Sequence, residues 1–167
     1  LCLATLHGNN SYHALNRILS FYPVEVRAAM LGDLSSALRA IVSQRLVRTV
    51  QGTRLPAAEV MLNTKLVADL IEQGNFSGIR EAMESSLAEG SQTFEEDLAR
   101  LVRDGLVARK EALANADSPT NLTWRLQNDF ALAANAAKAQ QQPQVLSASG
   151  ADDQPSFTEI VLDVHPD

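Results

Sequence analysis

The sequence predicts an α/β fold at its start, followed by a small all-α region and a disordered acidic tail. Apolar runs typical of strands alternate with helical patterns over residues 1–62. Short, capped helical patterns fill residues 63–137. Residues 138–167 are low in complexity and carry five acids and, after Lys138, no lysine or arginine. At 167 residues with 46% hydrophobic content, the chain can bury one modest core.

The first stretch, residues 1–6, is an apolar run that predicts a buried strand. His7 and Gly8 follow it and lead into a helical pattern. The apolar positions of that pattern are Ala14, Leu15, Ile18 and Leu19. Open α/β sheets present polar residues at a ligand crevice through such a strand–glycine–helix connection. Because Leu1 stands inside the predicted strand, we expect the chain to be the C-terminal part of a longer protein.

A second helix and a hairpin are predicted next. Apolar residues at helical spacing behind Pro23 predict one amphipathic helix over residues 24–44. Two β-like runs, residues 45–50 and 55–62, flank a glycine turn at residues 51–53 and predict a hairpin.

Two residues of the second β-like run stand out. Pro56 has no amide hydrogen, which places it at an edge or at the start of that strand. Glu59 is surrounded by small and apolar residues. We expect its carboxylate to pair with an arginine or to lie on the solvent face.

Caps and glycines divide residues 63–137 into short helices. The predicted helices are one capped by Asn63 or Thr64 and ended by Gly74, one from Ser77 to near Gly90, one from the Thr93–Glu96 capping box to Gly105, one over residues 109–116, and one from Ser118-Pro119 toward Ala137.

Charge and cysteine content exclude several classes of protein. The net charge is −6, and the body before the tail is nearly neutral, so the sequence carries no nucleic-acid footprint. The single Cys2 excludes an internal disulfide and suits a reducing compartment. No apolar run approaches the ~20 residues of a membrane helix. We expect a soluble, cytoplasmic protein with no metal site.

Several motifs together resemble a known family. ATLHGNN at residues 4–10 and ALNRILSFYP at residues 14–23 resemble the histidine-box region of the pilus retraction ATPases. These are the PilT/PilU group of the type II/IV secretion ATPases. The match continues through SQRLV (43–47), AAEVML (57–62) and SQTFEEDLARLV (91–102), and so covers roughly the first three quarters of the chain.

The resemblance implies a fold and an activity. Residues 1–62 would be the C-terminal end of a RecA-like P-loop ATPase domain, and residues 63–137 its helical C-terminal region. The parent would be a hexameric motor that hydrolyses ATP with Mg²⁺ to drive type IV pilus retraction and twitching motility. No glycine here is followed by lysine, so the sequence has no phosphate-binding G-x-x-x-x-G-K-[ST] loop. We therefore expect these 167 residues alone to be inactive and to bind no cofactor.

The family also implies partners and a location. The parent would form a homo-hexamer that contacts an inner-membrane pilus platform protein, with a paralogous retraction ATPase as a further partner. Its place would be cytoplasmic, peripheral to the inner-membrane pilus machinery.

Candidate site residues follow from the same resemblance. His7 would report nucleotide state near the γ-phosphate, and Thr5 could hydrogen-bond beside it; from the residues alone, a packed structural histidine is the alternative. Arg17, Gln44 and Arg45 match positions at which subunit-interface or coupling roles are expected, with solvated surface positions as the alternative. Asn16 departs from the family, which usually has aspartate before the arginine.

The helix over residues 64–74 matches a segment that carries two arginines in PilT-type motors. Both are absent here, which resembles the PilU branch. The positions expected to face a partner are Leu66, Val67, Asp69, Leu70 and Ile71. Three of them, Leu66, Leu70 and Ile71, also have ordinary core spacing.

Two other functions stay open. A secretion or pilus-assembly ATPase of the same superfamily would usually carry a C-x-x-C zinc segment, and this chain has one cysteine. A non-enzymatic helical module would instead use residues 63–137 to bind a partner.

Overall fold

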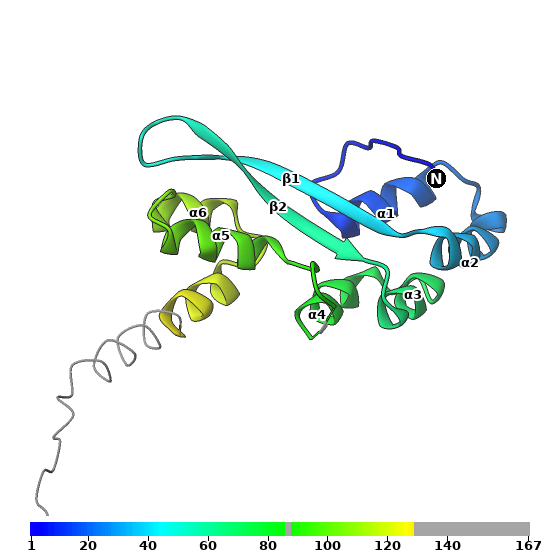
Figure 1. The fold of residues 1–167 in the computed structure, drawn as a ribbon. Helices are drawn as coiled ribbons and strands as arrows, with labels where there is room; N and C mark the ends of the chain where they lie inside the picture. Colours follow the sequence, from blue (N-terminus) through cyan, green and yellow to red (C-terminus); the bar gives the residue numbers. More distant parts are fainter. Residues whose placement is uncertain (86–87, 129–167) are drawn as a thin grey trace, which may run out of the picture.

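The computed structural model describes residues 1–85 and 88–128, which form a long twisted β-hairpin with helices packed at both of its ends (Figure 1). The hairpin consists of β1 (Ala40–Arg48) and β2 (Arg54–Leu62). The helices are α1 (Ser11–Ser20), α2 (Arg27–Ala37), α3 (Lys65–Glu72), α4 (Ile79–Glu84), α5 (Phe94–Arg103) and α6 (Arg109–Asn115), with 3₁₀ turns at Val24–Val26 and Phe76–Gly78 and a helix over residues 119–128.

The predicted hairpin is confirmed, and it is longer than predicted. β1 and β2 pair antiparallel, and their connection contains Gly52 at φ +85°, a backbone conformation that favours glycine. β1 begins at Ala40, so the prediction of a helix as far as residue 44 is wrong. Ile41 and Val42 suit either pattern by spacing, but their pairing with Met61 and Val60 decides for the strand.

The strand predicted over residues 1–6 is also wrong. Residues 1–8 have no regular secondary structure, and Leu1 and Leu3 are exposed (113% and 88%). A strand needs a partner for its backbone hydrogen bonds. Within the part of the chain that the structure describes, the one sheet contains β1 and β2, and neither pairs with this segment.

Local capping signals placed most of the helices correctly. Thr64 accepts a hydrogen bond from the Val67 amide at the start of α3, and Thr93 and Glu96 form the predicted capping box at α5. The exception is α4, which ends at Glu84 and not near Gly90. The last helix is described as far as residue 128, and the predicted disordered tail lies outside the described residues.

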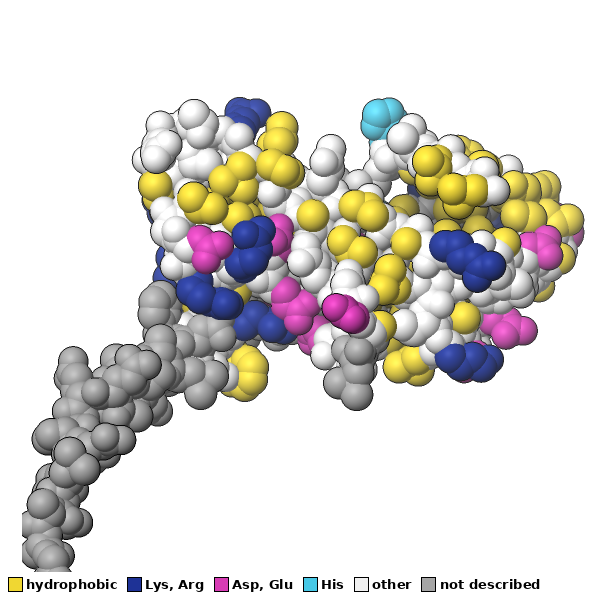
Figure 2. Space-filling view, in the orientation of Figure 1, with side chains coloured by type: hydrophobic (Ala, Val, Ile, Leu, Met, Phe, Trp, Pro, Cys, Tyr) yellow, Lys and Arg dark blue, Asp and Glu magenta, His cyan; other side chains and the backbone are white. Residues whose placement is uncertain are grey.

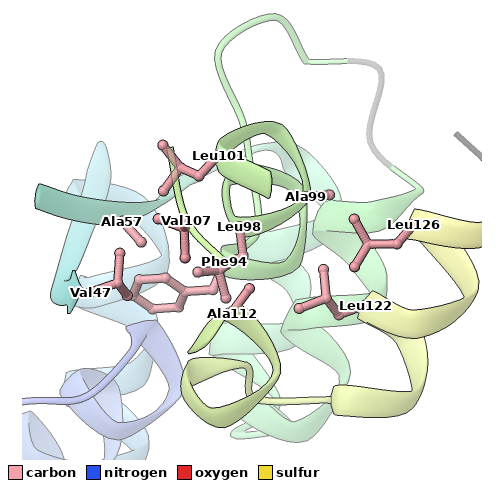
Figure 3. Close-up of a cluster of buried hydrophobic side chains, with 10 residues drawn as sticks. All are labelled: Val47, Ala57, Phe94, Leu98, Ala99, Leu101, Val107, Ala112, Leu122 and Leu126. Carbon is pink, nitrogen blue, oxygen red and sulfur yellow. The ribbon is translucent and has the colours of Figure 1, made fainter. Parts of the chain in front are cut away.

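Two hydrophobic clusters share the hairpin. Near its turn, Val47 and Ala57 pack with α5, α6 and the helix over residues 119–128 (Figure 3). At the other end, Met61 packs with side chains of α1, α3 and α4. Each cluster contains residues from both sides of residue 62, so the hairpin fixes the two helical groups relative to each other.

An apolar surface lies at the end of the molecule that carries α1 and α2 (Figure 2). The exposed large apolar side chains of the described residues include Leu1, Leu3, Phe21 and Val24. Over the described ranges 1–85 and 88–128, none of the helices is long and apolar enough to cross a membrane.

Candidate functional site

The loop that carries His7 leads directly into α1. Asn10 is the N-cap of this helix, and its Oδ1 accepts a hydrogen bond of 2.9 Å from the His13 amide. At Gly8, a Cβ would lie 3.2 Å from the Ala14 nitrogen, so a side chain there would force the loop away from α1. The His7 side chain itself is exposed and makes no hydrogen bond or ion pair to any of the described residues.

Arg45 holds this loop from the strand β1. Its Nη2 and Nε donate to the Asn9 carbonyl oxygen at 3.0 and 3.3 Å, and its Nη1 donates to the Asn115 carbonyl oxygen at 2.6 Å. The guanidinium also lies over the ring of Phe94, with Cζ 4.0 Å from the ring centroid. A planar group with five donors can make all these contacts at once, which lysine could not do.

Asp117 completes the arrangement from the segment between α6 and the last helix. Its Oδ1 forms an ion pair with Arg45 Nη2, and its Oδ2 accepts a hydrogen bond of 2.9 Å from Asn10 Nδ2. The Arg45 and Asp117 side chains are only 18% and 23% exposed, so the pair is partly desolvated. We call Asn9, Asn10, Arg45 and Asp117 the Arg45 network. Asp117 is not among the site residues predicted from the sequence, and its one local signal is its position just before the Ser118-Pro119 helix start.

Glu59, on β2, binds the first residue of α1. Its side chain is buried, and its Oε1 accepts a hydrogen bond of 2.7 Å from the Ser11 amide. The expectation of an arginine partner or a solvent-facing position is therefore wrong, because a backbone amide at a helix N-terminus takes the carboxylate. Burial raises the pKa of the Glu59 carboxyl above its ordinary value; the hydrogen bonds from Ser11 oppose this shift, and the charge of Asp117 adds to it.

A cavity of about 280 Å³ opens beside these groups, between the start of α1 and α4. Its charged lining groups are Glu59, Asp117 and Arg80, and Phe76 and Ile79 supply apolar walls. Among the described residues, no cluster of three or more histidine, cysteine or acidic side chains could hold a metal ion. Most of the polar groups here are engaged in holding the loop.

Three consecutive acids of α5 each bind a backbone amide. Glu95 Oε1 accepts from Ser118 N at 2.6 Å, and Asp97 Oδ2 accepts from Ala58 N at 2.8 Å. Glu96 Oε2 closes the capping box at 2.8 Å from the Thr93 amide. Because their oxygens are used within the fold, these acids support the scaffold that positions the Arg45 network.

The remaining predicted site residues lie apart from this network. Arg17 and Gln44 are exposed, as is Thr5 in the N-terminal segment. Gln44 lies on β1 and not at a helix end.

On α3, the residues expected to face a partner divide between the surface and the core. Leu66 is 51% exposed, and Asp69 pairs with Lys65 at 2.6 Å on the outer surface. Val67 and Ile71 are fully buried in the second hydrophobic cluster, and Leu70 packs against it. These three residues follow the helical period that faces the hairpin, so they are core residues.

Comparison with known proteins gives a consistent set of relatives. The chain is 41% identical over 157 residues to the type IV pilus ATPase PilU of Pseudomonas aeruginosa. This alignment covers 93% of this chain and 41% of the relative. It is 30% identical over 121 residues to the type IV pilus retraction ATPase PilT of the same organism, covering 72% of this chain and 35% of the relative. It thus spans about two fifths or less of these relatives' lengths. No family model matches the chain.

Solved structures agree with the sequence relatives. A crystal structure of the pilus retraction motor PilT with bound ADP matches 70% of this chain and 32% of its own, at a TM-score of 0.61 and 25% identity. The ATPase DotB of Legionella pneumophila matches 64% of this chain and 29% of its own, at a TM-score of 0.51 and 19% identity, which supports the fold alone. This chain therefore shares its fold with part of the PilT structure.

Proposed function

Because this chain belongs to the PilT/PilU family of type IV pilus ATPases, we propose that it works as part of an ATP-hydrolysing motor for type IV pilus retraction and twitching motility. The observation that carries the proposal is the 41% identity to PilU across 93% of the chain. That identity exceeds the 30% identity to PilT, in line with the absence of both arginines from the matched helix α3.

The geometry around His7 supports a role in reporting nucleotide state. A sensor residue needs a side chain free to meet the ligand and a backbone held in a fixed place. His7 has both properties: its side chain is exposed and unpaired within the described chain, while Gly8, Asn9 and Asn10 are held by contacts. A histidine that packed the core would instead be buried.

The nucleotide itself would bind mainly to parts supplied by the rest of the motor. The related PilT structure holds ADP. We propose ATP with Mg²⁺ as the cofactor of the whole motor, bound by a phosphate loop that this sequence lacks. A hexameric ring, a cytoplasmic location at the inner-membrane pilus machinery, and contact with a platform protein and a paralogous ATPase belong to the same proposal.

The rival assignment to a secretion or assembly ATPase has weaker support. It rests on the DotB ATPases of Legionella pneumophila and Yersinia pseudotuberculosis, which are 19% and 24% identical to this chain and support the fold alone. The helical-module alternative gains nothing from α3, since Val67 and Ile71 are buried in the core.

The test of the proposed function is His7→Ala in a longer protein that contains these 167 residues. We expect kcat for ATP to fall by about 100-fold or more, while the melting temperature stays within about 2 °C because an exposed side chain buries little area. Gln51→Ala, an exposed polar change at the hairpin turn, is the control and should retain full activity. Lower melting temperature with full specific activity would show that His7 only packs, and an inactive parent would refute the motor assignment.

A further inference from the structure

The Arg45 network joins two parts of the chain that are far apart in sequence. Asn10 and Asp117 are separated by 107 positions, and Arg45 and Asp117 by 72. The hydrogen bonds form a closed ring: Arg45 to Asp117, Asp117 to Asn10, and the adjacent Asn9 carbonyl back to Arg45. A closed ring of charge-assisted hydrogen bonds restricts the loop more than any one bond would.

The loop fixed in this way is the one that carries His7. One residue, Gly8, separates His7 from the ring's nearest contact, at Asn9. Asn10 also caps α1 through the His13 amide, so the same side chain links the loop to the helix and to Asp117. A shift of Asp117 would therefore move the backbone from which His7 projects.

Asp117 belongs to the helical part of the chain. It follows α6 and stands next to Ser118, whose amide donates to the buried Glu95 of α5 at 2.6 Å. Phe94, the residue before Glu95, lies under the Arg45 guanidinium. The position of Asp117 is therefore set by the packing of α5, α6 and the last helix around the first hydrophobic cluster.

From these contacts we infer that Asp117 is a positioning residue for His7: through Arg45 and Asn10 it fixes the histidine-box loop, so that the helical C-terminal region controls the geometry of the nucleotide-state sensor. The inference rests on the proposed function for its catalytic consequence. Its structural part, the dependence of the loop on Asp117, holds or fails in these 167 residues alone.

Two substitutions remove the link in different ways. Asp117→Asn removes the negative charge opposite Arg45. It also replaces one acceptor oxygen by an NH₂ donor, which cannot accept the hydrogen bond from the Asn10 amide group. Asn10→Ser keeps a good N-cap for α1 but is too short to reach Asp117. Asp104→Asn is the matched control, because it neutralises another carboxylate that pairs with an arginine, Arg100, at 3.3 Å at the C-terminal end of α5.

The first measurement is hydrogen exchange on the 167-residue chain, read from the peptides that cover residues 5–14. We expect both variants to raise exchange at residues 8–13 by about 10-fold or more, as expected when a loop gains local freedom. Peptides from β1 and β2 should not change, and Asp104→Asn should match the wild type. Unchanged exchange at residues 8–13 in both variants would overturn the inference while leaving the proposed function intact.

The second measurement is ATP hydrolysis by the longer protein. We expect Asp117→Asn and Asn10→Ser each to lower kcat by about 10- to 100-fold, the scale expected from misplacing a reacting group by about 1 Å, with KM within about twofold. The double variant should be no worse than the poorer single variant, because both act through one contact. Full kcat with a loosened loop would overturn the inference. An inactive wild type would refute the proposed function and with it the catalytic part of the inference, whatever the exchange data show.

Discussion

Glu59 offers the sharpest test of how this fold is held together. Its carboxylate is buried beneath the start of α1 and accepts the Ser11 amide at 2.7 Å. Glu59→Ala leaves that buried amide without its partner, which costs about 1–3 kcal/mol of unfolding free energy, and adds a cavity. Glu59→Gln keeps an oxygen in place for the amide and removes the buried charge. We expect it to stay within about 1 kcal/mol of the wild type at neutral pH.

The same residue predicts a direction for pH dependence. Because burial raises the pKa of Glu59 above 4.5, the folded state holds this proton more tightly than the unfolded state. The stabilising contribution is therefore greatest below the ordinary pKa of 4.5 and is lost as pH rises through the raised folded value. Two other charged groups, Asp117 and Arg80, line the adjacent cavity. Of these, the charge of Asp117 raises the Glu59 pKa further, and so extends the pH range over which the stabilising contribution persists.

The assay is urea unfolding of the wild type, Glu59→Gln and Glu59→Ala, followed by far-UV circular dichroism at several pH values between 4.5 and 8. The stability of the wild type minus that of Glu59→Gln should decrease as pH rises, since glutamine cannot titrate. A difference that increases with pH would mean that the ionised carboxylate is favoured in the fold. Equal stability of Glu59→Ala and the wild type would show that the Ser11 contact contributes nothing.

Two further predictions concern the acids of α5 and the isolated chain. Asp97→Ala should lower the unfolding free energy by about 1–3 kcal/mol, because the Ala58 amide and the Arg100 guanidinium both lose their acceptor; Asp104→Asn should cost under about 1 kcal/mol in the same urea titration. The 167-residue chain alone should show no ATPase activity and no rise in melting temperature with millimolar Mg-ATP. A shift reproduced by a non-hydrolysable analogue would reveal a nucleotide site in this chain.

Local signals in the sequence predicted the parts of the fold that depend on neighbouring residues. The Gly52 turn and the Thr93–Glu96 capping box each bring together residues a few positions apart, so spacing alone identifies them. The helix predicted through residue 44 failed because Ile41 and Val42 have an ambiguous pattern. Their pairing with β2, some 20 residues later, decides the conformation.

The candidate site depends even more on contacts between residues that are distant in the sequence. The resemblance placed His7 and Arg45 among the residues of interest, but the partners of Arg45 come from Asn9 and Asp117, on opposite sides of it in the chain. Tertiary packing brings them together, and no spacing rule encodes that. The burial of Glu59 was missed for a related reason: its partner is a backbone amide, which a search for complementary side chains does not consider.

The acidic residues in the family-like motifs therefore have a different role from that of the histidine. Glu59 in AAEVML and the acids Glu95 and Asp97 in SQTFEEDLARLV each accept a backbone amide at the start of a helix or within a strand. A carboxylate used in this way is already hydrogen-bonded and largely excluded from solvent, so it is poorly placed to bind Mg²⁺ or to activate water. His7 has no such internal partner among the described residues, yet its loop is anchored two residues away by the Arg45 network. Substitutions at the acids should consequently appear first as lost stability, and substitutions at His7 as lost turnover.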